Sequence, residues 1–255
     1  MRSILLVLCA VLVGGGALLA MGTAKPASVA TPVATADTGD KAAFGRRVRD
    51  YLIGNPEVLV EAMQEFERKQ DSQRDAVAQK AISQHKAELL ADPDSPASGN
   101  ANGDVVIVDF NDYQCPYCKR AHQAVKSVVA ADGKVKVIYK DLPILGEPSR
   151  IAALAAMAAV KQGKHLAFHD ALMEFSGKLD RARILEIAAS VGLDVALLEK
   201  DMEDPKFKQL IDRNMALAGA LGVRGTPAFV IGDQFVPGAV DAAALKQLIA
   251  DARKR

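Results

Sequence analysis

The sequence contains few cysteines, and neither sign of charge dominates it. Of its 255 residues three are cysteine, and 32 lysines and arginines face 31 aspartates and glutamates, for a formal net charge of +1. Proteins that hold nucleic acid by surface charge carry a basic excess, so the composition gives no support to that class. Exported domains stabilised by disulfides carry several well-separated cysteines, so that class is excluded as well.

The first residues have the pattern of an export signal. Arg2 supplies a positive start, an apolar run covers residues 4–21, and the small residues Ala20 and Gly22 suit cleavage by a signal peptidase. We therefore predict a signal peptide at 1–24 and a periplasmic mature protein. An uncleaved membrane anchor is the alternative, since the run is barely long enough to span a bilayer.

Only Cys115 and Cys118 remain once Cys9 leaves with the signal. A bond between them would close a tiny loop and restrain little of the unfolded chain, so the pair is predicted to serve chemistry and not stability. A redox-active disulfide is the expected active group, with no other cofactor. Such a pair could also be half of a zinc site, but no second ligand pair accompanies it, and a thiolate pair can hold copper(I).

The N-terminal part of the mature chain is predicted to be helical. Residues 25–40 are rich in Ala, Thr and Pro and are typical of a flexible tether. Helices are expected over 41–92, with a break at Gly54-Asn55-Pro56, where Asn55 should cap a second helix that reaches about Leu90. A turn-rich linker is expected over 93–103.

The rest of the chain, 104–255, has the pattern of an α/β domain. A strand, a helix and a second strand make a βαβ unit, a wholly helical block follows at about 148–221, and a hairpin turning at Gly232-Asp233 precedes a final helix. The order of elements predicts a thioredoxin-like fold with a helical insertion, preceded by an N-terminal helical extension.

The position of Cys115 favours its thiolate. Pro116 suits the first turn of a helix, so the Cys115 sulfur should meet unpaired backbone N–H groups and the positive end of the helix dipole. Lys119 and Arg120 add positive charge nearby. Because only a thiolate exchanges disulfides, we expect Cys115 to be the attacking, partly exposed sulfur and Cys118 the more buried resolving thiol.

Residues from about 100 to 255 resemble the DsbA branch of the thioredoxin superfamily. The resemblance is carried by Asp109-Phe110, Cys115-Pro116-Tyr117-Cys118-Lys119, Gly225-Thr226-Pro227-Ala228-Phe229 and the helical block between them. It implies a thiol–disulfide oxidoreductase acting on exported proteins that carry thiols or disulfides, with a membrane redox partner and no nucleic acid. The stretch Asn55-Pro56-Glu57-Val58-Leu59 resembles the suppressor-of-copper-sensitivity C proteins, a periplasmic DsbA-like group that includes trimers.

The resemblance assigns roles to individual residues. Asp109 matches a buried acid that can accept the proton of Cys118; Lys140 could pair with it or simply be solvated. Thr226 and Pro227 match a cis-proline loop beside the active sulfur, where the Thr226 backbone can pair with a substrate strand. Pro116 and Tyr117 complete the expected substrate-binding surface. Because Tyr117 replaces the histidine of the strongest oxidases, a milder redox couple is expected.

Two further patterns bear on assembly and on metal binding. Apolar and polar residues at spacings of four and three form the seam of a predicted coiled coil: Leu59, Met63, Phe66, Gln70, Gln73 and Val77. This seam favours self-association. The resemblance to the copper-sensitivity C group implies a homotrimer, and several active sites facing a shared space would suit a disulfide isomerase. The alternatives are a monomeric DsbA-like oxidase, a copper(I)-binding or thiol-protective protein, and a chaperone-like module. His165 and His169 are four residues apart but lack a third ligand by motif, so no metal site is predicted.

Overall fold

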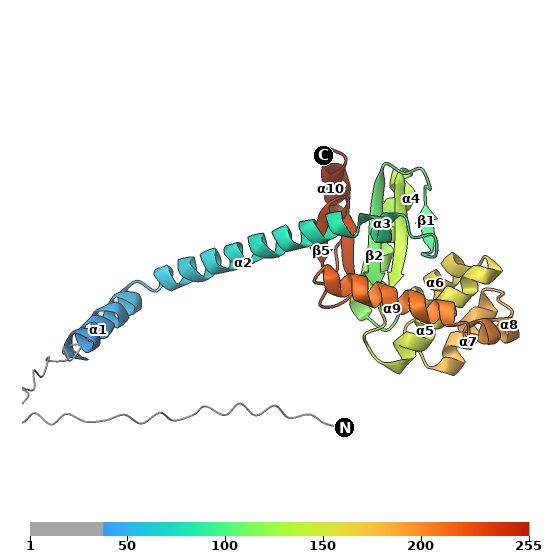
Figure 1. Ribbon diagram of the computed structural model, residues 1–255, viewed down its shortest axis with the longest axis horizontal. Helices are drawn as coiled ribbons and strands as arrows, with labels where there is room; N and C mark the ends of the chain where they lie inside the picture. Colours follow the sequence, from blue (N-terminus) through green and yellow to red (C-terminus); the bar gives the residue numbers. More distant parts are fainter. Residues whose placement is uncertain (1–37, 255) are drawn as a thin grey trace, which may run out of the picture. The chain divides into compact units, whose positions relative to one another are not determined.

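The structure is a computed structural model that describes residues 38–254 (Figure 1). The predicted signal peptide at 1–24, with Cys9, and most of the predicted tether lie outside the described residues. The described residues divide into two units, one that ends at Leu59 and one that begins at Val60. Within the described part, no helix is both long enough and apolar enough to cross a membrane.

The first described helix is α1, Thr38–Gly54. Most of its larger apolar side chains are exposed, including Phe44, Tyr51 and Ile53. The predicted break follows, but Asn55 does not cap the next helix. Its side-chain amide donates to the Tyr51 carbonyl at 2.8 Å, so it satisfies the end of α1 instead. An asparagine amide can donate as well as accept, and sequence alone does not say which helix end it serves.

Helix α2, Glu57–Gln84, ends earlier than predicted, and a short helix α3, Lys86–Leu90, follows it. The last turns of α2 bury Ala81 and Ile82, and α3 buries Leu89 completely. These side chains pack against β-sheet residues in one apolar cluster. The end of the helical region is therefore part of the core of the α/β domain and not a separate extension.

A five-stranded sheet forms the centre of this unit, with the order β1-β3-β2-β4-β5. The strands are β1 Ala97–Gly99, β2 Val105–Asn111, β3 Val135–Asp141, β4 Ala228–Ile231 and β5 Gln234–Pro237. The parallel pair of β2 and β3 is connected by α4, Pro116–Asp132, which is the predicted βαβ unit. The predicted hairpin joins β4 and β5. β1 lies within the predicted linker and pairs antiparallel with β3.

Alternation along β2 decides which layer each of its side chains meets. Ile107 packs in the cluster that contains α4 and α10, Ala242–Ala252. Val108 and Phe110 pack on the other face, with α9 (Pro205–Ala220) and the ends of α2 and α3. Asp109 shares the register of Ile107 and therefore faces the layer of α4.

The predicted helical insertion is present between β3 and β4 (Figure 1). Besides α9, it consists of α5 Glu147–Ala158, a 3₁₀ turn Ala159–Gln162, α6 His165–Glu174, α7 Arg181–Ser190 and α8 Val195–Asp201. Its alanine-rich core extends to Tyr113, Cys115 and Cys118, so the insertion packs directly against the cysteine pair.

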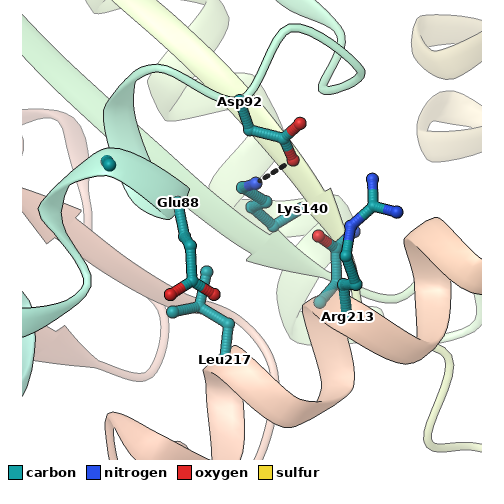
Figure 2. A pocket seen from close by; sticks show the side chains of 7 residues that line it. Glu88, Asp92, Lys140, Arg213 and Leu217 are labelled. Carbon is teal, nitrogen blue, oxygen red and sulfur yellow. Dashed lines mark hydrogen bonds and ion pairs between the residues drawn. The ribbon is translucent and has the colours of Figure 1, made fainter.

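Lys140 is neither solvated nor paired with Asp109. Its side chain is 1% exposed, and its ammonium lies 2.8 Å from a carboxylate oxygen of Asp92 (Figure 2). A cavity of about 240 Å³ adjoins the pair and is also lined by Glu88, Arg213 and Leu217. The ion pair therefore joins the segment after α3 to strand β3, which the sequence separation of the two residues concealed.

Candidate active site

Cys115 occupies the N-cap of α4, with Pro116 in the first turn. Its sulfur accepts a hydrogen bond from the Cys118 backbone N–H at 3.4 Å, one of the orphan donors of the helix start. Both cysteines are free thiols. The expected contrast in exposure is wrong: Cys115 is 4% exposed and Cys118 is 3% exposed. The packing of the insertion against the pair covers both sulfurs.

The two sulfurs differ in their electrostatic surroundings. Burial raises the pKa of the Cys118 thiol far above its ordinary value, although the Asp112 backbone N–H donates to that sulfur at 3.5 Å. The negative charge of Asp109 raises the pKa further. Cys118 therefore stays protonated until a nearby base removes its proton, whereas the Cys115 sulfur sits at the positive end of α4.

Asp109 lies near the carboxyl end of β2 and is 5% exposed. Desolvation raises the pKa of its carboxyl to about 7. Within the described part of the chain its Oδ1 atom has no hydrogen-bond partner. A buried carboxyl that titrates near neutral pH and acts electrostatically on a buried thiol is equipped to take up and return that thiol's proton.

The loop before β4 lies beside Cys115. The Thr226–Pro227 peptide bond is cis. The Cys115 thiol donates to the Thr226 carbonyl at 3.2 Å, which links residues that are 111 positions apart. Pro116 and Tyr117 are exposed at the start of α4, and Pro227 is buried. The structure thus brings the predicted catalytic and substrate-binding residues to one place.

The two cations that follow the cysteines are engaged elsewhere. The Lys119 ammonium donates to the backbone carbonyls of Leu172 and Phe175 at 3.1 and 2.6 Å, at the end of α6. The guanidinium of Arg120 lies over the Tyr117 ring, 5.1 Å from its centroid. Lys119 therefore ties α4 to the insertion, and its expected electrostatic role toward Cys115 is not seen among its contacts.

Sequence reasoning missed Asp112, which shapes the loop before Cys115. Its carboxylate accepts from the Ser149 hydroxyl at 2.7 Å and from the backbone N–H groups of Gln114, Ile144 and Leu145 at 2.8, 2.9 and 3.0 Å. One buried side chain thereby joins the cysteine loop, the loop after β3 and helix α5. An aspartate often accepts a hydrogen bond from the backbone N–H two residues later in a loop, so the bond from Gln114 could have been predicted. The distant partners of Asp112 could not be read from the sequence.

Sequence reasoning also missed Asp141, a buried acid like Asp109 that lies at the end of β3. Burial raises the pKa of its carboxyl to about 8, and the charge of Asp109 adds to the effect. Asp141 stands in register with Asn111, at the same edge of the sheet as the end of β2. Because the carboxyl ends of parallel strands meet at one edge, the Asp residues near the ends of both strands were a usable signal.

Comparison with protein families finds two matches in this chain. Residues 106–250 match the DSBA-like thioredoxin domain. Residues 40–73 match the copper resistance protein ScsC N-terminal domain. The two matches together cover nearly all of α1, most of α2 and nearly all of the α/β domain that begins with β2.

Solved structures agree with these matches. A thioredoxin-like oxidoreductase from Silicibacter pomeroyi is 48% identical, covers 66% of this chain and 98% of its own length, and superposes with a TM-score of 0.65. The catalytic domain of Proteus mirabilis ScsC is 32% identical, with 69% and 99% covered and a TM-score of 0.64.

Curated relatives include much longer proteins. A Na(+)/H(+) antiporter of Salinispora arenicola is 28% identical over 164 residues, which are 63% of this chain but 25% of the antiporter. The chain thus spans about a quarter of that relative, whose transport activity is not carried over. The family match and the structural neighbours agree with the cysteine geometry. The chain therefore belongs to the DSBA-like thioredoxin family of thiol–disulfide oxidoreductases, and it carries an ScsC-type N-terminal region in addition.

Proposed function

We propose that this protein is a homotrimeric disulfide isomerase of exported proteins in the periplasm, directed there by a signal peptide at 1–24. The observation that carries the proposal is an exposed apolar stripe on the helices that precede the α/β domain. A monomeric thiol–disulfide oxidoreductase has no need of such a stripe.

The stripe is most distinct on α2. Leu59, Met63 and Phe66 follow one another at spacings of four and three, and are 48%, 63% and 62% exposed. Apolar side chains at this period are buried when helices pair along a seam. The region is also the part of the chain that matches the ScsC N-terminal domain. Self-association would remove these side chains from water, and the resemblance to a group that includes trimers favours three copies.

The proposed chemistry uses the two cysteines in sequence. The Cys115 thiolate attacks one sulfur of a substrate disulfide; the S–S bond breaks, the other substrate sulfur leaves as a thiolate, and a mixed disulfide forms. In isomerisation the freed substrate thiolate attacks another substrate disulfide, and Cys115 is finally displaced. In the escape route Cys118 passes its proton to Asp109 and attacks the Cys115 sulfur, which releases reduced substrate and leaves the Cys115–Cys118 disulfide. A membrane redox partner would then return the pair to its working state.

Substrate binding is assigned to the surface around Cys115. The backbone of Thr226 would pair with an extended substrate strand, with Pro227 beside the sulfur and with Pro116 and Tyr117 at the edge. Such pairing recognises main chain and is tolerant of side chains, which suits misfolded substrates. Several sites facing one space would let a substrate released from one copy be captured by the next.

The test separates assembly from chemistry. Truncation through Leu90 would remove Ile82 and Leu89 from the core, so charge substitution in the full mature chain is the better perturbation. Met63→Glu together with Phe66→Glu should convert a sedimenting trimer to monomer and abolish refolding of scrambled ribonuclease, while reduction of a small disulfide continues. Gln64→Glu with Ser72→Glu, on the opposite side of α2, is the matched control and should change neither.

Two results would overturn the isomerase proposal. A mature wild-type protein that sediments as a monomer would remove its basis. An obligate monomer that still refolds scrambled substrate as fast as wild type would show that assembly is irrelevant. The first outcome leaves a monomeric DsbA-like oxidase as the function, and the second leaves an isomerase activity that does not depend on assembly.

Copper(I) binding by the cysteine pair is a second candidate. Its support is the name of the family that matches residues 40–73, together with two free thiols in one turn of α4. Thiolate sulfur is the ligand that copper(I) prefers. A copper(I) titration of the reduced protein, repeated after alkylation of both thiols, tests it: binding that survives alkylation would exclude the pair as the site.

A further inference from the structure

Three histidines lie together between α4 and α6, close to the active-site helix start but outside the thiol chemistry. His122, His165 and His169 are 5%, 7% and 0% exposed. Each has a buried Nε2 atom with no hydrogen-bond partner in the part of the chain that the structure describes, although that of His122 lies 3.5 Å from a carboxylate oxygen of Asp170. A buried polar atom left unpaired is costly, and in folded proteins it commonly marks an ion or a functional role.

Two of these histidines converge with a carboxylate. One ligand atom each from His122, His169 and Asp170 lie within 4.8 Å of one another. Ligand atoms around a tetrahedral zinc ion lie about 3.4 Å apart, as follows from metal–ligand distances near 2.1 Å. The cluster would have to contract by up to about 1.4 Å to enclose an ion. His165 stacks on His169 and is not one of the three converging groups.

The surrounding groups already orient two of the three ligands. The Tyr113 hydroxyl is hydrogen-bonded to His169 Nδ1 at 2.9 Å, which leaves Nε2 as the free nitrogen. Lys126 lies 2.8 Å from Asp170 Oδ2, while Asp170 Oδ1 lies 3.5 Å from His122 Nε2. A hydrogen bond to the second nitrogen of a ligating histidine, and a partner on the second carboxylate oxygen, are typical of metal sites. Glu174 shares the charge of Lys126 at 2.8 Å, which reduces its repulsion of a cation.

An ion could reach the cluster from solvent. A cavity of about 500 Å³ is lined by His122, Lys126 and Asp170, with Tyr139 and Leu166 on its wall. Asp170 is the most exposed of the three ligands, with 23% of its side chain accessible. The deeper His169 is reached past these two groups.

We propose that His122, His169 and Asp170 bind one divalent transition-metal ion of the zinc class, at a site separate from Cys115 and Cys118. Imidazole nitrogen with one carboxylate is a donor set that suits such ions and gives little affinity for copper(I), which prefers sulfur. The proposed ligands differ from His165 and His169, the two histidines that the sequence places four residues apart. His122 of α4 takes the place of His165, and Asp170 is the third ligand. The proposal does not depend on the isomerase assignment.

The experiment uses the full mature protein in its oxidised form, so that the Cys115–Cys118 disulfide removes both thiols as competing ligands. Isothermal titration with Zn²⁺ alone should show one ion per chain, and the ion should raise the melting temperature. Asp170→Asn and His122→Gln should each weaken binding by at least about tenfold, since each removes a ligand. His85→Gln is the matched control, because His85 lies outside the cluster and pairs with Glu88; it should bind as wild type does.

The fold of each variant is checked by its melting temperature in the presence of a chelator. Should His122→Gln fail to fold, the partly exposed Asp170→Asn still decides the question. Absence of zinc binding by the oxidised wild type would overturn the proposal. Binding that Asp170→Asn leaves unchanged, or that His85→Gln removes, would overturn it equally, because the ion would then sit elsewhere on the surface.

Discussion

Replacing Asp109 by asparagine should make the protein more stable at neutral and alkaline pH while it impairs the chemistry. Burial raises the pKa of the Asp109 carboxyl from 3.8 to about 7. An acid with a raised folded-state pKa holds its proton more tightly in the folded protein. Its stabilising contribution is therefore complete below the unfolded pKa and is lost as pH rises toward the folded pKa. For Asp109 the loss falls between about pH 4 and pH 7.

The magnitude follows from the size of this shift. One pKa unit corresponds to about 1.4 kcal/mol. Integrated between about pH 5 and about pH 8, the titration of Asp109 should lower the unfolding free energy of the wild type by roughly 2–3 kcal/mol. Asparagine is neutral throughout, so the variant should gain that amount relative to wild type over the same interval. Urea unfolding at the two pH values measures the difference directly.

The same substitution should slow resolution of the mixed disulfide. Without a carboxylate at position 109, the Cys118 thiol keeps the proton that its burial already favours. We expect resolution to slow on the order of 10²-fold, the lower range for loss of a general base, while mixed-disulfide formation by Cys115 changes little. Acid-quenched mixing experiments with a disulfide peptide, read by mass spectrometry, separate the two steps. The wild-type resolving rate should rise with a midpoint near the Asp109 pKa of about 7, and the variant should lose that midpoint.

Asp141→Asn is the matched control. Asp141 is 1% exposed, and burial raises the pKa of its carboxyl to about 8. The charges that act on the Cys118 thiol include Asp109 and Cys115. As pH rises, Asp141→Asn should therefore gain stability relative to wild type, as Asp109→Asn does. It should leave resolution of the mixed disulfide at its wild-type rate. Two results would refute the role of Asp109: Asp141→Asn slows resolution as much as Asp109→Asn does, or Asp109→Asn follows the wild-type dependence of stability on pH.

Two further predictions concern the cysteine pair. Mild alkylation of the reduced protein at slightly acidic pH should label Cys115 before Cys118, because Cys115 caps α4 while burial raises the pKa of Cys118; peptide mapping that finds Cys118 labelled first would reverse the assignment. Tyr117→His should make the Cys115–Cys118 couple more oxidising, by roughly 30 mV for each tenfold gain in stability of the reduced form. Equilibration with glutathione measures this reduction potential. An unchanged or more reducing potential would show that position 117 does not act on the thiolate.

The sequence predicted those features of the fold that are determined by residues a few positions away. Pro116 at the start of a helix placed Cys115 at its N-cap, and the turn at Gly232-Asp233 placed the hairpin. The βαβ unit and the helical insertion also followed from hydrophobic pattern and turn residues. These features depend on neighbours within a few positions, which the sequence displays. Asp109 is an intermediate case: the resemblance to the DsbA branch implied a buried acid at this position, and the alternation of β2 turns it toward α4.

Contacts between distant segments could not be predicted in the same way. Lys140 was expected near Asp109 or in solvent, yet Asp92, 48 positions away, is its partner. The exposure of Cys115 was overestimated because the insertion packs over the helix start. The strand β1 is short and polar, and it forms only because the edge of β3 offers it hydrogen bonds. His122 joins His169 through the packing of α4 on α6, for which no spacing within one helix could give a signal.

The pair of Lys140 and Asp92 shows how such a distant contact should affect stability. Burial opposes ionisation of Asp92, but the Lys140 ammonium and the Asp94 backbone N–H outweigh it and lower the pKa of this carboxyl. A carboxyl with a lowered folded-state pKa contributes stability above its unfolded pKa, and that contribution is lost as pH falls through the folded pKa. Lys140 itself is held in the interior beside the cavity shown in Figure 2, so the pair is not a surface contact.

Lys140→Met should therefore destabilise the protein by about 2–3 kcal/mol at neutral pH, somewhat below the loss for a fully buried pair because 14% of the Asp92 side chain is exposed. Arg213→Met is the control, since Arg213 is 49% exposed and pairs with Asp94; it should cost less than about 1 kcal/mol. In acid, protonation of Asp92 leaves the wild-type Lys140 without its anion, so the gap between wild type and Lys140→Met should shrink as pH falls below about 4. Urea unfolding across this range decides the matter: a gap that stays constant with pH would mean that the Lys140 side chain acts by filling space and that its charge contributes nothing.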